Sequence, residues 1–216
     1  MVELDFAVEQ ASVVPHAATP LLLFALRVAN RTPAIAVENV LLRCQIRIEP
    51  VRRRYAEQEQ ESLSDLFGAP SRWAETLRSF LWTHTGAQIP AFTTGCTVEL
   101  PVPCSYDFNL AATKYFHGLE DGEAPLSLLF SGSIFYRDEE DRLQIDQVSW
   151  TREANFRLPV RVWHDMMQHY YPDAAWLCLR RDAFEQLYGY KRRHGLATFE
   201  QAIETLIAVD TTEQAR

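Results

Sequence analysis

The sequence is poor in glycine and has no long apolar run. Its 216 residues include eight glycines, which leaves little material for a phosphate-binding loop, and neither G-x-x-x-x-G-K-S/T nor G-x-G-x-x-G occurs. The aliphatic run at residues 21–26 is far shorter than the roughly 20 residues that cross a bilayer. The first five residues are acidic where a secretory signal is basic. We therefore expect a cytoplasmic protein without a membrane partner.

Cysteine is scarce as well. Cys44, Cys96, Cys104 and Cys178 form no C-x-x-C pair. Cys44 and Cys96 lie on the apolar faces of their predicted strands, which is typical of a buried thiol. The sequence spacing of Cys96 and Cys104 permits a disulfide between them, but such a bond would not persist in a reducing cytosol. The cysteines therefore predict buried thiols and not a disulfide framework.

Motifs for catalysis and metal binding are also missing. The G-x-S-x-G pattern of a nucleophile elbow does not occur around Gly132. His164 and His169 are five positions apart, about 140° around a helix, so they cannot chelate one ion together. The acidic run at residues 138–141 lacks the spacing of a calcium loop. We expect no catalytic residue, metal or cofactor. An enzyme remains an alternative, because carboxylates that pair in space are invisible in a sequence.

Positive charge is lacking in most of the chain. The formal charge is −8, and residues 1–150 carry 12 basic and 20 acidic side chains, against nine of each in residues 151–216. An acidic body repels phosphate backbones, so we do not expect nucleic acid to be a partner. Eight acidic residues between Glu120 and Asp146 could form a patch that meets an arginine-rich partner. The sequence assigns no role to the arginines at residues 52–54.

What the sequence does contain is an alternation of apolar and polar residues with a period of two. In residues 40–49 the apolar positions are Val40, Leu42, Cys44, Ile46 and Ile48, as in a half-buried antiparallel strand. Seven or eight such segments, separated by turn sequences, favour a sandwich over a parallel sheet. They lie near residues 2–8, 22–28, 40–49, 92–100, 106–110, 126–136, 143–150 and 156–158. We predict a mainly β protein with α, an antiparallel β-sandwich over residues 1–158.

Two regions break this alternation. A helical insertion is predicted at about residues 50–89, because Trp73, Leu77, Phe80 and Leu81 share one face of a helix beginning near Ser71. After Pro159 the period becomes helical, which predicts a C-terminal helical extension over residues 159–209. Residues 210–216 are small and polar, and they predict a disordered tail.

The opening of the chain is similar to a known fold family. Val28-Ala29-Asn30-Arg31-Thr32, followed by Val37-Glu38-Asn39-Val40-Leu41-Leu42, resembles the first strands of immunoglobulin-like bacterial sandwiches. The resemblance implies an immunoglobulin-like sandwich and carries no active site.

The C-terminal segment suggests an alternative. Trp176 to Arg181, followed by helices at 182–194 and from Thr198, resembles the ribbon-helix-helix module, which reads DNA with polar strand residues. The alternate strand positions here are Trp176, Cys178 and Arg180, which are mostly apolar and depart from that pattern. A DNA-binding regulator is therefore an alternative to the function predicted below.

A third resemblance covers the full chain and is clearest near its end. It rests on Leu158-Pro159-Val160, Trp163, Met166-Met167, Tyr171-Pro172, Ala175-Trp176-Leu177 and Tyr188. By this pattern the chain resembles an uncharacterised bacterial family of unknown function, associated with gene clusters for nickel–iron hydrogenases. The resemblance implies an accessory or maturation role and supplies no catalytic residue.

Aromatic residues gather in the extension. Trp163, Tyr170, Tyr171 and Trp176 lie close together in the sequence, and buried aromatics dominate many interfaces. Docking of the extension onto the sandwich is the other explanation. We predict a non-catalytic accessory or assembly factor that binds another protein through these four residues, for example in maturation of a nickel–iron hydrogenase. A homodimer through a sandwich edge or the tail stays open.

Overall fold

The computed structural model describes residues 2–214. Within these residues the chain forms eight β-strands and seven α-helices. It divides into two compact units, Met1–Trp176 and Leu177–Arg216, which we call the body and the C-terminal unit and describe separately. Among residues 2–214, no helix is both long and apolar enough to cross a membrane.

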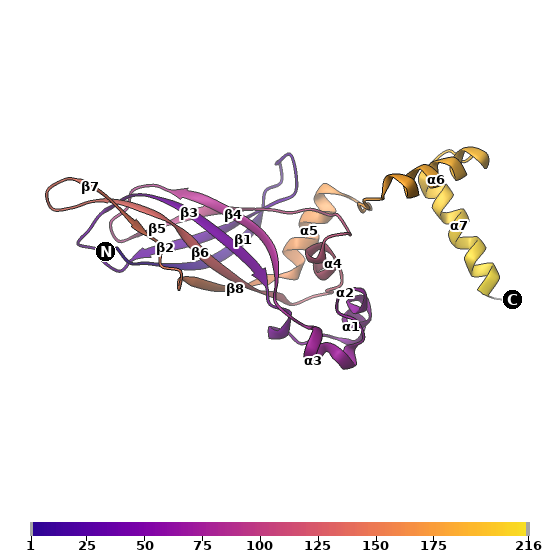
Figure 1. The fold of residues 1–216 in the computed structure, drawn as a ribbon, viewed down its shortest axis with the longest axis horizontal. Coiled ribbons are helices and arrows are strands. Elements are labelled where there is room, and N and C mark those ends of the chain that lie inside the picture. Colours follow the sequence, from indigo (N-terminus) through magenta and orange to yellow (C-terminus); the bar gives the residue numbers. More distant parts are fainter. Residues whose placement is uncertain (1, 215–216) are drawn as a thin grey trace. The chain divides into compact units, whose positions relative to one another are not determined.

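The strands of the body form two antiparallel sheets (Figure 1). The first sheet has the order β1-β2-β5, with bounds Leu4–Val13, Leu21–Asn30 and Gly95–Pro103. The second has the order β4-β3-β6-β7, with bounds Phe80–Ile89, Val37–Ile48, Glu123–Arg137 and Leu143–Gln147. β8 (Glu153–Pro159) also pairs with β6, along residues 123–129, whereas β7 pairs with residues 133–137. This confirms a mainly β, sandwich-like architecture with helices.

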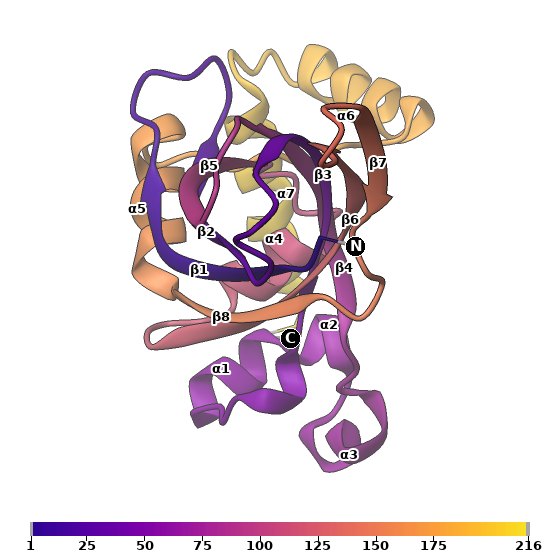
Figure 2. The ribbon, with the colours of Figure 1, turned by 90° about the vertical axis from the view of Figure 1, so that its left-hand side faces the viewer.

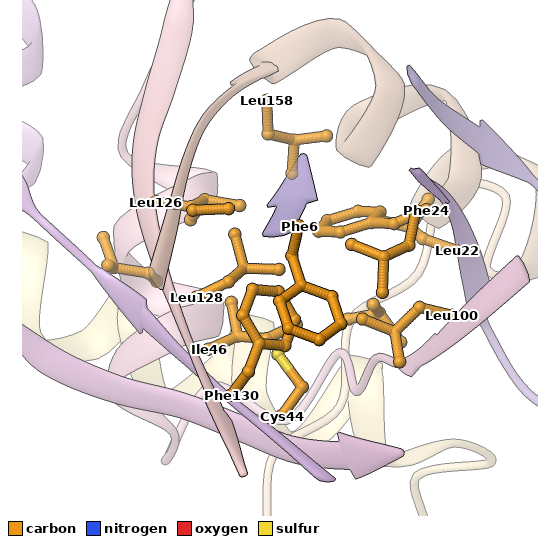
Figure 3. Close-up of a cluster of buried hydrophobic side chains, with 14 of the residues drawn as sticks. Phe6, Leu22, Phe24, Cys44, Ile46, Leu100, Leu126, Leu128, Phe130 and Leu158 are labelled. Carbon is orange, nitrogen blue, oxygen red and sulfur yellow. The ribbon is translucent and has the colours of Figure 1, made fainter. Parts of the chain in front are cut away.

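The apolar faces of the two sheets meet in one core. Figure 3 shows side chains of the first sheet, such as Phe6 and Phe24, directed at those of the second, such as Ile46 and Phe130. The rings of Phe6 and Phe130 stack with their centroids 4.4 Å apart. The sheets also approach each other at two edges, β4 with β5 and β1 with β8 (Figure 2). The period-two alternation therefore reflects burial of one face of each strand.

The connection between β3 and β4 holds the helical insertion, which is shorter than predicted. Its α-helices are α1 (Glu57–Ser62), α2 (Ser64–Phe67) and α3 (Trp73–Thr76), with single 3₁₀ turns at Pro50–Arg52 and Pro70–Arg72. The helix predicted through Leu81 ends at Thr76. Phe80 begins β4 instead, because it pairs with Ile48 in the sheet and packs against Phe67. Tertiary pairing thus overrides the helical period at these positions.

A second correction concerns the strand predicted near residues 106–110. The Asp107 side chain accepts a hydrogen bond from the Asn109 backbone N–H at 2.9 Å, an Asx turn, and α4 (Ala111–His117) follows. The predicted strand over residues 92–100 is displaced too. Phe92 forms an isolated bridge with Val37, and β5 begins at Gly95.

Two helices cover one end of the body (Figure 1). They are α4 and α5 (Val160–Tyr170), which contact one another and bury Phe116 and Trp163. The β6–β7 hairpin lies at the opposite end. The body thus has one end capped by helices and aromatic rings, and this end carries the candidate site.

The C-terminal unit contains α6 (Arg181–Arg193) and α7 (Phe199–Gln214), joined by a turn with Gly195 at φ +65°. Both helices were expected, but α7 continues to Gln214 where a disordered tail was predicted. No glycine or proline follows Gly195, so nothing in the sequence interrupts the helix. Residues 215–216 of that predicted tail lie outside the described residues. The ribbon strand that the alternative ribbon-helix-helix resemblance implies at residues 176–181 is not formed among the described residues, where Trp176 makes an isolated bridge to Asp107.

Candidate functional site

Trp163, the first of the four predicted partner-binding residues, is buried inside the body. Its side chain leaves the apolar face of α5, which also buries Val160, Met166 and Met167. The indole stacks on the Phe116 ring at 5.3 Å and meets the Tyr106 ring edge-on at 5.8 Å. Trp163 therefore supports the surface above it and does not itself project to a partner.

Tyr170, the second of these residues, holds a loop of its own chain. Its hydroxyl donates to the Val14 carbonyl and accepts from the Ala17 backbone N–H at 2.9 Å. The neighbouring His169 donates from Nε2 to the Pro15 carbonyl at 2.7 Å. Both residues thus fix the β1–β2 loop against the end of α5.

Tyr171 and Trp176, the last two, reach the surface. Tyr171 stacks on Tyr106 at 5.8 Å and contacts the Trp176 ring at 5.3 Å, and Trp176 is 57% exposed. Two backbone hydrogen bonds join the segments: the Trp176 N–H donates to Tyr106 and the Phe108 N–H donates to Trp176. The structure therefore brings two predicted residues together with an aromatic side chain from before α4.

Tyr106 and Tyr171 line a groove of about 540 Å³, and Trp176 lies beside it against Tyr171. We call it the aromatic groove and define it by Tyr106, His117, Trp163, Asp165, Tyr171 and Asp173. The buried Trp163 is one of its lining residues, and the polar face of α5 contributes the exposed carboxylate of Asp165. Asp173, in a left-handed backbone conformation at φ +52°, supplies a second carboxylate. Among the described residues neither carboxylate forms an ion pair.

The two histidines of the groove differ in their surroundings. His164 donates from Nε2 to the Phe116 carbonyl at 2.9 Å. The His117 ring packs edge-on against Phe108 at 4.7 Å. Partial burial, and then the charge of His164, lower the pKa of His117 below its ordinary value. His117 therefore takes up a proton less readily than an ordinary histidine does, which reduces the positive charge it can place beside the two aspartates.

The groove offers surfaces for a cation and no arrangement for covalent chemistry. Tyrosine faces attract a cation, and carboxylates accept hydrogen bonds from a guanidinium. Within residues 2–214, no three His, Cys, Asp or Glu side chains come close enough to hold a metal ion. In a smaller recess beside Trp163, burial raises the pKa of the Cys104 thiol to about 12, which makes it a poor nucleophile.

One of the arginines at residues 52–54, Arg53, has a structural role. Arg53 and Glu59 form an ion pair in which the side chains are 10% and 5% exposed. Arg53 also donates to the carbonyls of Asp121 and Glu123. Arg53 therefore fastens the insertion to the start of β6.

The acidic residues between Glu120 and Asp146 do not form the single patch that the sequence suggested. Glu123 begins β6 and Asp138 directly follows its end. At the rise per residue of a β-strand, these two residues are about 50 Å apart. Asp138 and Glu140 pair with Arg142, and Asp141 pairs with Arg137. These charges are separated and partly neutralised.

The sequence did not reveal Tyr106, His117, Asp165 or Asp173 as groove residues. The first was assigned to a strand because Tyr106, Phe108 and Leu110 alternate. The Asp107-x-Asn109 spacing, which favours an Asx turn, was the available signal for a loop. The aspartates carry no local signal, since their proximity arises from the packing of α5 and the following turn.

A comparison with protein-family models gives a match over almost the whole chain. A family model described as "Family of unknown function (DUF6084)" matches residues 1–215. It confirms the predicted resemblance to an uncharacterised family. A search of curated proteins finds no match.

Proposed function

The chain belongs to this family of unknown function, and from its structure we propose that it is an accessory factor that binds another protein. The aromatic groove takes a basic segment of that partner, and an arginine side chain in particular. The observation that carries the proposal is the convergence of Tyr106, Tyr171 and two unpaired aspartates on one groove.

Arginine fits this groove better than lysine does. Its planar guanidinium can stack on a tyrosine face while its N–H groups meet a carboxylate, whereas an ammonium is a compact and strongly hydrated charge. Asp165 and Asp173 lie on different elements that line the groove, so one guanidinium can contact an aromatic ring and a carboxylate together.

The charge of the body supports a basic partner. Residues 1–176 carry 15 basic and 23 acidic side chains, whereas residues 177–216 carry six of each. The whole formal charge of −8 therefore lies on the body. Such a field favours encounter with a positively charged segment and raises its association rate at low salt.

Two finer proposals accompany this one. The pairs β1–β2, β2–β5, β3–β6 and β6–β7 match the A–B, B–E, C–F and F–G pairs of an immunoglobulin-like sandwich, which supports that topology. The resemblance to a family associated with hydrogenase gene clusters, which rests on residues from Leu158 onward, supports the second proposal. This proposal is a role in the maturation of a metalloenzyme, such as a nickel–iron hydrogenase. The partner's basic segment would then belong to that enzyme or to its assembly machinery.

The test compares labelled peptides that differ at a single position, carrying arginine, lysine or citrulline, by fluorescence anisotropy with the full chain. Citrulline keeps the shape of arginine and removes its charge. We expect affinity to fall from arginine to lysine to citrulline. Equal affinity for the arginine and citrulline peptides would contradict the proposal.

Variants locate the binding. Asp173→Asn and Asp165→Asn should each weaken arginine-peptide binding. Asp141→Asn is the matched control, because Asp141 also has a left-handed backbone, at φ +59°, and lies in the distant β6–β7 hairpin. A photo-crosslinking residue at Gln168, on the exposed face of α5, should then capture the natural partner. Loss of binding in Asp141→Asn equal to that in Asp173→Asn would place the peptide elsewhere.

A further inference from the structure

The C-terminal unit leaves most of its apolar side chains exposed. Among residues 177–209, whose side chains the structure describes, Ala202 is the one buried residue. Eight large apolar side chains are 40–64% exposed: Leu177, Leu179, Phe184, Tyr188, Ile203, Leu206, Ile207 and Val209. A hairpin of fewer than about 40 residues with so little core is not expected to be stable without further burial.

The two helices contact each other over a short length. Phe199, at the start of α7, packs against Phe184 at 5.5 Å and Tyr188 at 6.2 Å on α6. Beyond this contact α7 diverges from α6 (Figure 1). On α7 beyond this contact, Ile203, Leu206 and Val209 remain 42–51% exposed.

Some of these residues belong to a repeat that is typical of a coiled coil. On α7, Phe199, the buried Ala202, Leu206 and Val209 follow one another at spacings of three, four and three. On α6, Phe184 and Leu187 are three positions apart, and Lys191 follows four positions later. Such a repeat places an apolar seam along α7 and along the first half of α6, and seams of this kind pack against other helices.

The charges of the two helices are complementary. Helix α6 carries four basic and two acidic side chains, whereas α7 carries four acidic side chains and no basic one. Among the described side chains no ion pair joins α6 to α7, since the pairs of this unit join Arg180 to Asp182 and Arg181 to Glu185. The opposite charges of the hairpin are therefore available to another molecule.

We propose that the C-terminal unit associates with the same unit of a second copy of this chain, forming a four-helix arrangement in which α6 of each copy packs against α7 of the other. A two-fold axis makes both contacts identical, and each brings a basic helix against an acidic one. An unrelated partner would need to supply both signs of charge, whereas a second copy supplies them by symmetry.

The apolar area is sufficient for such a dimer. Each of the eight exposed side chains presents on the order of 80 Å². Two copies therefore bring together roughly 1,300 Å² of apolar surface, above the ~1,000 Å² expected of a specific interface. The dimer does not depend on the aromatic groove, so this inference and the proposed function can fail separately.

Sedimentation velocity of the full chain over a range of concentrations tests the proposal. We expect a dimer of twice the 24.9 kDa chain mass. Leu206→Glu should raise the dissociation constant about 100-fold or more, because each dimer loses two buried leucines and gains two charges. Gln186→Glu adds the same charge to an exposed position of α6, away from the seam, and should leave the constant within about threefold. A monomer at every concentration, or equal effects of the two variants, would overturn the proposal.

Charge reversal separates specific pairing from a simple loss of folding. Glu204→Arg places a positive charge on the acidic α7, and Arg192→Glu with Arg193→Glu gives α6 a net negative charge. Each variant alone should dissociate at least tenfold more readily, because the new side chains add like-charge repulsion at both contacts. A mixture of the two variants should form a heterodimer, in which one contact keeps the original charges and the other brings the new arginine of α7 against the new glutamates of α6. Failure of the mixture to restore the dimer would contradict pairing of α6 with α7 of the partner copy.

Discussion

The ion pair between Arg53 and Glu59 should be among the most sensitive points in the body. Its two side chains are 10% and 5% exposed. Besides Arg53, Glu59 accepts hydrogen bonds from the backbone N–H groups of Ala56 at 3.1 Å and Glu120 at 3.0 Å. One carboxylate therefore joins the beginning of α1, the preceding arginine and the loop that leads into β6.

Glu59→Ala should lower the free energy of unfolding by about 3–5 kcal/mol. The substitution leaves the buried guanidinium without its carboxylate, which costs about that much in comparable pairs. It also removes the acceptor of two backbone N–H groups, at roughly 1.5–3 kcal/mol for each bond to a charged group. These effects overlap, so we do not add them.

Urea unfolding, followed by circular dichroism and tryptophan fluorescence, measures the change. Glu75→Ala, which truncates an exposed glutamate in the same insertion, is the control and should change stability by no more than about 0.5 kcal/mol. The double replacement of Arg53→Met with Glu59→Leu should cost less than Glu59→Ala alone, because no uncompensated charge remains. A cost below about 1 kcal/mol for Glu59→Ala, or a double variant as unstable as the sum of its single variants, would refute this reasoning.

Three further predictions concern the body. Phe130→Ala should cost about 3–5 kcal/mol in urea unfolding, since the ring stacks on Phe6 in the core, and a loss below about 1 kcal/mol would show that the stack is dispensable. Gly132→Ala should destabilise by more than about 1 kcal/mol, because φ is +149° and the new Cβ would lie 2.1 Å from the Leu41 carbonyl oxygen; a thermal midpoint equal to that of the unaltered chain would contradict the strain. The lowered pKa of His117 means that the unfolded chain binds a proton first on acidification. Stability should therefore fall as the pH drops below about 6.5 towards the folded-state pKa, and His117→Gln should flatten this dependence between pH 7.5 and 5. An unchanged pH profile in that variant would remove His117 as the cause.

The sequence predicted the sheets well because most strands, such as β2 and β3, bury one face. Ile46 and its alternate neighbours on β3 carry that signal locally, and the partner strands add nothing to it. Phe80 shows where the signal fails. Its spacing from Trp73 and Leu77 fits a helix, but its pairing with Ile48 and its contact with Phe67 come from distant parts of the chain. Local periodicity cannot report on such contacts.

The candidate site was predictable in part. Tyr171 and Trp176 were found because aromatic residues cluster in the sequence. Tyr106 was not, because it meets Tyr171 through the loop before α4, more than 60 residues earlier in the chain. Asp173 had no distinguishing signal beside other surface aspartates. A groove made from three separate segments exists only after the body has folded.

The position of β6 has a consequence for how the protein is made. β6 pairs with β3 on one side and with β7 and β8 on the other, so the second sheet is complete only after Pro159 has been synthesised. Until β6 emerges, β3 has an apolar face and one edge without its partner strand. Its earliest available neighbour in the second sheet is β4. The helices of the insertion emerge during this interval, and slow translation after them would prolong the period in which the nascent chain is prone to aggregate.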